Sequence, residues 1–382
     1  MGLRLEVITA IDDLKGLGQD WDVLQRASGT SVFTSHLWTL TWFEHFWGLA
    51  SPRVLAFYQK DELKGVAPLA LYRTKLSRFT LSYLCLAGNV GETTEYHDLG
   101  FPFSLDTGEA AEALLRGMRR LRWDMLQLRD LRCDALTKAL FQRMGKDWAA
   151  EMNDSKPCPY VTLNKGKEIL ENFEPRSAKK VQRILDSLEN EGRICFRTRR
   201  SPDSLAQAVD VYVEQHKRRW AAKGGSIFND PRQASFLKDI STRSAEKGEM
   251  LVYEVLIDGN VAAQQFCILE RDVVRLFKIG MNDDYRPYAP GYLSVYYAMK
   301  ETQEEGYAEY DLGPGPEEYK YKVGGVDRWT CNIHGKRGVA LLGSNLAKLP
   351  GLRGWSSKLL SQKSTEAQAA ANKPKLDTEI ER

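Results

Sequence analysis

Apolar and polar positions follow two similar series along the chain. Residues 53–73 (RVLAFYQKDELKGVAPLALYR) place two apolar runs around a charged turn, and residues 250–269 (MLVYEVLIDGNVAAQQFCIL) do the same around Asp258-Gly259. Paired runs of this kind are typical of a β-hairpin, and Asp-Gly supplies the positive φ angles that a tight turn needs. The pattern therefore predicts one hairpin in each half of the chain.

The same order of elements follows each predicted hairpin. Helical spacing over 109–122 leads into a strand at 123–131, and helical spacing over 292–305 leads into a strand at 307–313. A short helix and a final extended segment then complete each half, at 134–144 and 148–163 in the first half and at 316–323 and 326–342 in the second. This internal repeat predicts an α+β fold of mixed sheets and helices, built as two tandem domains.

The predicted domain boundaries follow from the repeat. The first domain is expected at 1–165 and the second at 166–345, with a C-terminal helix and disordered tail at 346–382, where the last twenty residues are polar and lack aromatics. The segment 166–200 is polar and helical, and it fits either a linker helix or the first helix of the second domain.

Composition narrows the class of protein. Hydrophobic residues make up 43 % of the 382 positions, and the net charge is only +3, which gives no reason to expect DNA or another polyanion as partner. The six cysteines are scattered without CxxC spacing, so we expect reduced thiols and no metal. The sequence shows no secretory signal and no apolar run near the roughly 18 residues of a membrane span. These features predict a cytoplasmic protein.

A helical stretch in the first half is rich in aromatic side chains. In 33–48 (FTSHLWTLTWFEHFWG), Trp38, Trp42 and Phe46 fall on one helix face, after Thr34 and Ser35, either of which can cap the helix. Such a face either packs into the core or stacks on a sugar or acyl chain.

A second helix, beginning near Pro202, carries the segment HKRRW at 216–220. His216 is a candidate general base because the pKa of an imidazole lies near neutrality, although a core histidine with satisfied ring nitrogens fits the pattern too. Arg219 beside Trp220 is a candidate for binding an anionic part of a ligand.

A loop rich in proline precedes the next predicted helix. In 281–297 (MNDDYRPYAPGYLSVYY), a strand ends near Met281, and Arg286 and Gly291 follow before the helix begins. Backbone N–H groups at a helix start, the helix dipole and an arginine are the parts of a pyrophosphate site.

The stretch YDLGPGPEEYKYKVGG at 310–325 breaks a strand abruptly. Asp311 is expected at the end of a buried strand, where it is either a hydrogen-bonded structural carboxylate or a general base. The Pro-Gly-Pro that follows cannot continue a ladder and would place Glu317, Tyr319 and Lys320 at the strand end, where sheet proteins build sites.

These four stretches occur in the order found in a known family. Together they resemble the CelD-like acetyltransferases, a branch of the GNAT superfamily associated with bacterial cellulose and exopolysaccharide synthesis, over positions 20–342. The family is similar to two GNAT domains in tandem, a plan shared with Fem-type aminoacyltransferases. Motifs of P-loop nucleotidases, GxGxxG dehydrogenases, HExxH proteases and GxSxG hydrolases are absent from the sequence.

The resemblance implies roles for particular residues. The cofactor, acetyl-CoA or another acyl-CoA, would be bound by Tyr285, Arg286, Pro290, Gly291 and Tyr292. This loop keeps an arginine and a glycine of the usual [QR]xxGx[GA] pattern but has prolines in the spacing. Candidate bases are Asp311, then His216, then Glu317. The substrate side would be lined by Arg219, Trp220, Gln264, Lys278, Tyr319 and Lys320. The first half has no arginine in its 87–100 loop, so it is expected to be a degenerate copy.

The implied function is transfer of an acyl group from acyl-CoA to an amine or hydroxyl of a saccharide or other cell-envelope precursor. Backbone N–H groups of a splayed strand would hold the thioester carbonyl while a base takes the acceptor's proton. One alternative is aminoacyl transfer from aminoacyl-tRNA, which the low net charge disfavours. The other is a non-catalytic scaffold in a polysaccharide synthase complex at the inner membrane.

Overall fold

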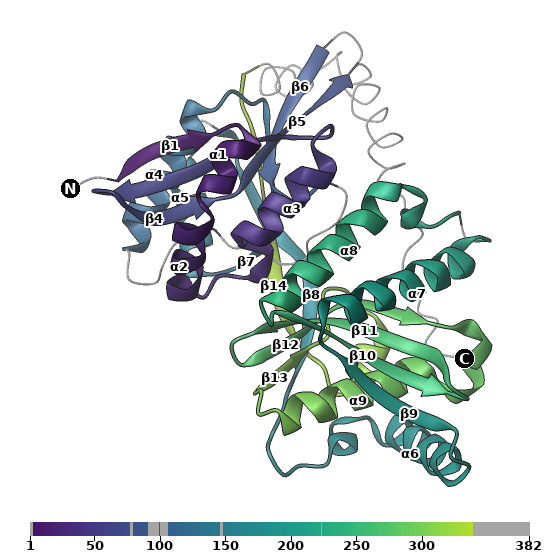
Figure 1. Ribbon diagram of the computed structural model, residues 1–382. Coiled ribbons are helices and arrows are strands. Elements are labelled where there is room, and N and C mark those ends of the chain that lie inside the picture. Colours follow the sequence, from purple (N-terminus) through teal and green to yellow (C-terminus); the bar gives the residue numbers. More distant parts are fainter. Residues whose placement is uncertain are drawn as a thin grey trace, which may run out of the picture. The chain divides into compact units, whose positions relative to one another are not determined.

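The computed structural model describes residues 3–76, 79–90, 99, 106–145, 148–222 and 224–338. Within this part of the chain there are two compact units, one of residues 3–155 with 329–338 and one of residues 156–328 (Figure 1). The predicted tail at 346–382 lies outside the described residues. In the part of the chain that is described, no helix combines the length and hydrophobicity needed to cross a bilayer.

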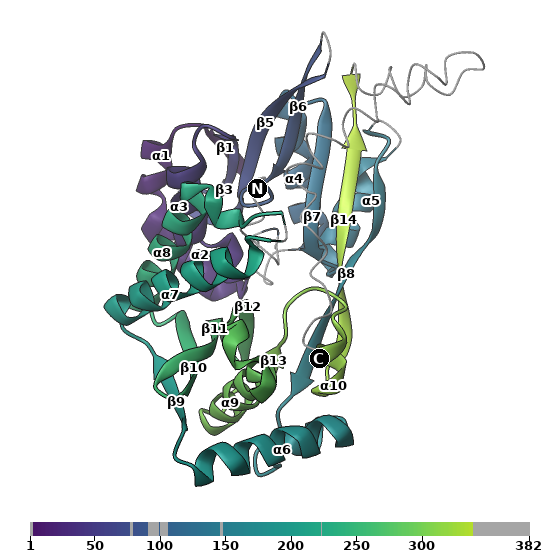
Figure 2. The same ribbon diagram turned by 90° about the vertical axis from the view of Figure 1, so that its right-hand side faces the viewer.

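The first unit packs helices on both faces of its strands (Figure 2). Its elements are β1 (Arg4–Ile8), α1 (Ile11–Gly16), α2 (Gly18–Ser28), η1 (Val32–Thr34), α3 (His36–Phe46), β2 (Ser51–Pro52), β3 (Val54–Gln59), β4 (Glu62–Ala67), β5 (Leu69–Leu76), β6 (Phe79–Leu86), α4 (Thr107–Arg120), β7 (Met125–Arg132), α5 (Ala135–Met144) and β8 (Glu151–Thr162), which continues into the second unit. The predicted hairpin is β3–β4. Pro68 separates β4 from β5. Strand β4 pairs with β3, whereas β5 pairs with β6.

The aromatic stretch of the first unit belongs to the core. The Ser35 side chain caps α3 by accepting from the Trp38 amide. Trp38, Trp42 and Phe46 are at most 1 % exposed. Complete burial accounts for this aromatic face and leaves no surface on it for a sugar or acyl chain.

The elements of the second unit after β8 are η3 (Ile169–Asn172), α6 (Pro175–Asn190), β9 (Ile194–Arg199), α7 (Pro202–Trp220), η4 (Ile227–Asn229), α8 (Pro231–Glu246), β10 (Met250–Ile257), β11 (Asn260–Glu270), β12 (Val273–Met281), η5 (Asp283–Tyr288), α9 (Pro290–Glu304), β13 (Glu309–Asp311), α10 (Glu318–Lys322) and β14 (Val326–Lys336), which continues into the first unit. From β9 onward the second unit follows the order of the first, with β12 alone where the first unit has β5 and β6 and with no counterpart of β2. The strand order within the unit is β8-β13-β12-β11-β10-β9. The β10–β11 hairpin turns at Asp258 and Gly259, with φ of 52° and 77°, as the sequence predicts.

Helices cover both faces of this sheet. Helices α7 and α8 lie on one face, and α6 and α9 lie on the other (Figures 1 and 2). Successive β10 residues alternate between the faces: Tyr253 and Val255 pack with Leu293 of α9 in the core, while Glu254 between them points to the opposite face. The sheet is thereby buried on both sides, which explains the nearly continuous apolar run of β10.

Strand β8 follows the first unit in the sequence but pairs within the second, and β14 follows the second unit but pairs within the first. Residues 160–162 of β8 pair antiparallel with β13 in the second unit. Residues 330–336 of β14 pair antiparallel with β7 in the first unit. The predicted boundary at 165/166 therefore falls after a part of β8 that already belongs to the second unit, whose limits are 156 and 328.

Candidate active site

Strands β12 and β13 are parallel neighbours over three residues and then separate. Residues 273–275 pair with Glu309–Asp311, whereas β12 continues along β11 to Met281. Strand β13 stops because the prolines of the segment 314–316 cannot donate to a ladder. Among the described residues, no strand pairs with the β13 side of β12 over 276–281. We call this backbone stretch the open edge.

A β-bulge lies inside the open edge. Phe266 of β11 is opposite Lys278, but Cys267 is opposite Leu276, so Phe277 has no residue opposite it on β11. Bulges turn backbone groups out of the regular ladder and are over-represented beside active sites. Over 276–281, the β13 side of β12 therefore faces no other strand among the described residues, and the bulge turns backbone groups there out of the regular ladder.

The open edge leads through η5 into the first turn of α9. Ala289 at the N-cap has a left-handed backbone, with φ of 47° and ψ of 52°, and no side chain caps the helix. Pro290 and Gly291 follow in the first turn, and both are buried. Pro290 has no N–H, and the N–H groups of Tyr292 and Leu293 donate to the Ala289 carbonyl at 3.0 and 3.3 Å. The turn therefore offers an anion the Gly291 N–H and the partial positive charge of the helix dipole.

The predicted cofactor residues thus come together at one end of β12. Arg286 is exposed on η5 and supplies a cation beside the first turn of α9. Tyr292 is 5 % exposed and belongs to the core, and Tyr285 packs against the same core from η5. The tyrosines therefore shape the loop, while Arg286 and the backbone at Gly291 are the groups suited to a phosphate.

The arginines of HKRRW hold this loop at the end of α7. Arg218 Nη2 lies 3.0 Å from Asp284 Oδ2, and Arg219 Nε lies 3.9 Å from Asp283 Oδ1. Arg219 was predicted to bind substrate, and the structure places it against η5. Ion pairs of this kind contribute at most about 1 kcal/mol each, so they connect the end of α7 to η5 but hold it only weakly.

His216 lies in an aromatic cluster on α7. Its ring stacks on Trp220 with centroids 5.7 Å apart and meets Phe228 edge-on at 5.0 Å. Its Nδ1 lies 2.8 Å from the Ser226 Oγ, which orients the ring. The side chain is half-buried, as is Trp220. This arrangement fixes an imidazole on the α7 face of the sheet.

The α7 face also holds the predicted substrate residues of β11 and β12. Gln264 is fully buried, and with its amide oriented to satisfy both ends it donates to the Ala208 carbonyl at 3.2 Å and accepts from the Tyr212 amide at 3.0 Å. The Tyr212 ring packs closely on Gly280. A Cβ at this position would lie 2.7 Å from the ring, so the contact requires glycine. Gln264 therefore joins the sheet to α7. Lys278 is half-buried, and its ammonium lies 4.4 Å from the ring centroid of Phe277.

Asp311, the first candidate base, is fully buried at the end of β13. Its Oδ2 accepts from Arg275 Nη1 at 2.6 Å and from Arg328 Nη2 at 3.0 Å, and its Oδ1 accepts from the Gly313 amide at 2.8 Å. Both oxygens are engaged by donors of the protein. These contacts fix the end of β13 to β12 and to the turn that follows. A role of Asp311 as general base stays a prediction.

Lys320 and Glu317 lie at the Pro-Gly-Pro turn, as predicted, but they bond to the turn itself. The Lys320 ammonium donates to the carbonyls of Gly313 and Pro314, both at 2.9 Å, and pairs with Glu317 at 2.8 Å. Tyr319 is 7 % exposed and packs in the core. Contact of these three side chains with an acceptor stays a prediction.

Sequence reasoning missed several residues that shape the site. No local signal marks the bulge at Phe277 or identifies Arg275 and Arg328 as partners of Asp311. A signal did exist for Gln265, since two adjacent glutamines interrupt an apolar strand in VAAQQFCIL. One of them reaches each face of the sheet, and Gln265 bonds Ser294 of α9.

Comparisons with known proteins agree with this geometry. Residues 175–321 match the family described as acetyltransferase (GNAT) domain, and no curated protein matches the sequence. The matched range contains β12, the open edge and the first turn of α9. The predicted fold class, α+β with a GNAT fold, is confirmed.

Solved structures show the same fold over nearly the whole chain. The chain is similar to FemX, with a TM-score of 0.61 and 14 % identity, covering 90 % of this chain and 100 % of that one. It is similar to L-PGS from Bacillus licheniformis, with 0.54 and 10 %, covering 93 % and 97 %. It is also similar to a conserved protein of unknown function from Bacteroides thetaiotaomicron VPI-5482, with 0.52 and 9 %, covering 88 % and 100 %. At such identities the likeness shows the fold alone, and the CelD-like resemblance stays a prediction.

Proposed function

We propose that this chain is an acyltransferase that moves an acyl group from acyl-CoA to an amine or hydroxyl. The observation that carries the proposal is the continuity of the open edge with the uncapped first turn of α9. Acyl-CoA joins a diphosphate to an extended arm that contains amides and ends in a thioester. A strand edge that faces no other described strand suits the arm, and a helix start beside an arginine suits the diphosphate.

The residues present fit that ligand in a definite order. The first turn of α9 and Arg286 would hold the phosphates, and the open edge would hold the arm by strand-like hydrogen bonds. The thioester would then lie near the bulge at Phe277, where β12 and β13 separate. A backbone N–H there would stabilise the oxyanion that forms as the acceptor attacks.

The reaction balances without an intermediate on the protein. The acceptor nitrogen or oxygen forms a bond to the thioester carbonyl carbon, the carbon–sulfur bond breaks, and the thiolate leaves. The proton that the acceptor loses passes to a base and finally to the thiolate. His216, held by Ser226 on the α7 face, is our candidate base, because both oxygens of Asp311 are engaged with the protein.

The acceptor class follows from the sequence resemblance. We infer a saccharide or another cell-envelope precursor, with a polysaccharide synthase complex as the setting. Release of free thiol from acetyl-CoA, measured with amino sugars and with neutral sugars, shows whether the acceptor must carry an amine. Turnover with neither class contradicts the inferred acceptor and leaves the donor test below unaffected.

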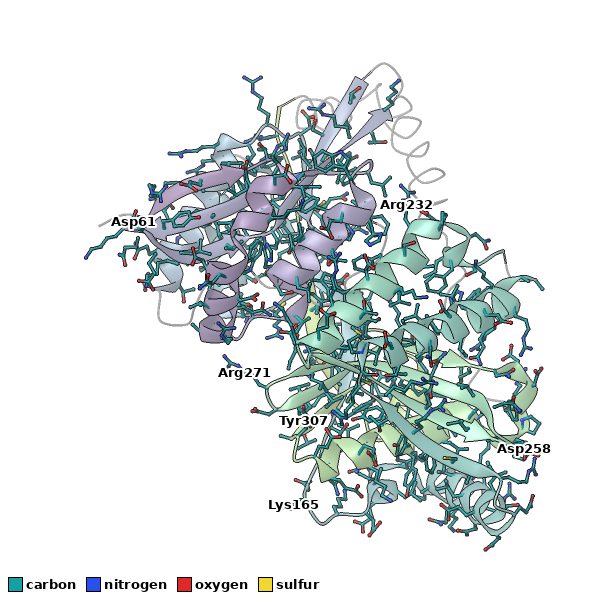
Figure 3. All side chains as sticks on the ribbon, in the orientation of Figure 1. Asp61, Lys165, Arg232, Asp258, Arg271 and Tyr307 are labelled. Atoms are coloured by element: carbon teal, nitrogen blue, oxygen red, sulfur yellow. The ribbon has the colours of Figure 1, made fainter. Side chains whose placement is uncertain are left out.

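Calorimetric titration with CoA tests the donor site. Wild-type protein should bind CoA with a micromolar Kd, and Arg286→Ala should weaken binding about tenfold, because a charge-assisted hydrogen bond is lost. Arg271→Ala is the matched control, since Figure 3 shows Arg271 at the end of the unit opposite the Asp258 turn, away from where β12 ends. No binding by wild type, or equal loss in both variants, contradicts the proposal.

Aminoacyl transfer from aminoacyl-tRNA is the second candidate. The likeness to FemX favours it, and so does a cationic stripe on α6 formed by Arg176, Lys179, Lys180 and Arg183. These residues share one helix face near the N-terminus of α6, where the dipole disfavours cations, so the stripe is suited to a polyanion. Salt-dependent binding of tRNA that Lys179→Glu abolishes, without binding of CoA, would favour this candidate.

A further inference from the structure

A chain of buried side-chain hydrogen bonds connects three elements of the second unit. The Tyr310 hydroxyl of β13 donates to Gln265 Oε1 of β11. Gln265 Nε2 donates to the Ser294 Oγ of α9 at 2.8 Å, and that hydroxyl donates to the Gly291 carbonyl at 2.8 Å. The three side chains are 0 % exposed. We call Tyr310, Gln265, Ser294 and the Gly291 carbonyl the buried relay.

The hydrogen bonds of the buried relay all run in one direction. The Gly291 carbonyl can only accept, so the Ser294 hydroxyl gives its proton there and must accept from Gln265. The amide oxygen of Gln265 is then left to accept from Tyr310. Burial raises the pKa of Tyr310 well above its usual value, so the phenol stays a donor at neutral pH. Hydrogen bonds aligned in this way strengthen one another.

The buried relay passes beneath the open edge. Tyr310 is opposite Val274 on β12, whereas Gln265 is opposite Ile279 further along that strand. The phenol therefore reaches diagonally across β12, on the face covered by α9, at the level where β12 and β13 separate. At its other end the relay reaches the first turn of α9, at Gly291.

Packing alone does not account for these residues. A buried polar group costs free energy unless it is paired, and apolar side chains of similar shape would fill the same space without that cost. The first turn of α9 begins at a left-handed Ala289, with Pro290 in its first position, and no side-chain hydrogen bond caps it. The relay supplies a fixed connection from the sheet to that turn.

We propose that Gln265 and Ser294 are positioning residues for acyl-CoA, setting the first turn of α9 against the open edge so that phosphates and thioester are held together. This role rests on the proposed function. Neither residue contacts the ligand in this account. Both act through the backbone of α9 at Gly291.

A matched pair of variants in α9 tests the role by CoA titration. Ser294→Ala removes the relay hydroxyl, whereas Thr302→Val removes a hydroxyl that is equally buried and donates to the Ala298 carbonyl near the other end of the helix. The Kd for CoA should rise about five- to tenfold in Ser294→Ala and stay within about twofold of wild type in Thr302→Val. Their melting temperatures control for general destabilisation.

A second variant gives a readout that a merely structural role would not produce. In Gln265→Glu, the new side chain can donate to Ser294 only when protonated, and burial raises the pKa of such a carboxyl. The ratio of variant to wild-type Kd for CoA should therefore fall as the pH is lowered from about 8 to about 6. This variant also carries the test if Ser294→Ala does not fold.

The outcomes separate the two claims. Wild type that binds CoA, with a weakened Ser294→Ala, an unaffected Thr302→Val and a pH-dependent Gln265→Glu ratio, supports the positioning role. Wild type that binds CoA, with equal affinities in both α9 variants or a constant Gln265→Glu ratio, overturns the role alone. Wild type that does not bind CoA overturns the proposed function, and the role falls with it.

Discussion

The ammonium of Lys320 lies 2.8 Å from a carboxylate oxygen of Glu317 at the turn that ends β13. The same ammonium donates to the carbonyls of Gly313 and Pro314 and, at 3.3 Å, to that of Gly315. An ammonium has three protons, so its donors are committed to the turn. A side chain that the sequence places beside a substrate thus fixes the shape of the segment that opens the edge of β12.

Loss of this ammonium should destabilise the second unit. We expect Lys320→Met to lower the free energy of unfolding by about 3 kcal/mol, because it leaves Glu317 and buried carbonyls without their cation. Urea denaturation measures the change. Lys322→Met is the matched control, since Lys322 pairs with Glu318 at 2.8 Å where the two side chains are 26 % and 53 % exposed, and its loss should cost less than about 1 kcal/mol. Equal stabilities of the two variants would contradict this account of Lys320.

Asp311→Asn distinguishes an anchor from a base. Removing the charge takes from Arg275, which is buried, one of its carboxylate partners, so we expect a loss of about 3 kcal/mol in unfolding free energy. A variant that unfolds like wild type but shows no thiol release from acetyl-CoA would instead identify Asp311 as the base.

His216→Gln tests the remaining base candidate. We expect thiol release from acetyl-CoA with a productive acceptor to fall by roughly 10²-fold to 10⁴-fold, because general base catalysis contributes that much. Binding of CoA should be unchanged, and the acid limb of the pH–rate profile should disappear. His45→Gln, on α3, is the control histidine. A wild-type pH–rate profile in His216→Gln would exclude it as the base.

His334 on β14 should make the stability depend on pH. Burial, together with the nearby Arg129, lowers the pKa of this imidazole in the folded protein. The unfolded chain then binds more protons, so stability is complete above the unfolded pKa near 6.5 and is lost as the pH falls through that value toward the folded pKa. Melting temperatures between about pH 5.5 and 8 should fall on acidification more in wild type than in His334→Gln. Parallel curves would contradict the assignment.

Local patterns predicted the elements that depend on neighbouring residues. The hairpin at Asp258-Gly259, a cap at Thr34 or Ser35 and the stop after Asp311 each follow from turn, capping or proline chemistry within a few positions, and the structure places the cap at Ser35. The aromatic face with Trp42 left two readings open, because periodicity shows which residues share a face and not what covers it. Because Trp42 is fully buried in the structure, this aromatic face belongs to the core.

Features that depend on residues far apart in the sequence could not be predicted from local patterns. Asp311 pairs with Arg275 and Arg328, and neither partner is marked by its own neighbours. The placement of β8 and β14 depends on strand pairing across the length of the chain. The sequence predicts Lys320 as a ligand group because its type suits an anion, yet the local turn engages its donors. Residue type indicates possible chemistry, and only the fold shows which group is already engaged.

Hydrogen–deuterium exchange with and without acetyl-CoA tests the central claim most directly, because that claim concerns backbone N–H groups. We predict slower exchange on adding acetyl-CoA in peptides that cover 276–281 and the first turn of α9, with no change in β3–β4 of the first unit. Unchanged exchange over 276–281 in the presence of saturating acetyl-CoA would contradict the proposal that the open edge binds the acyl donor.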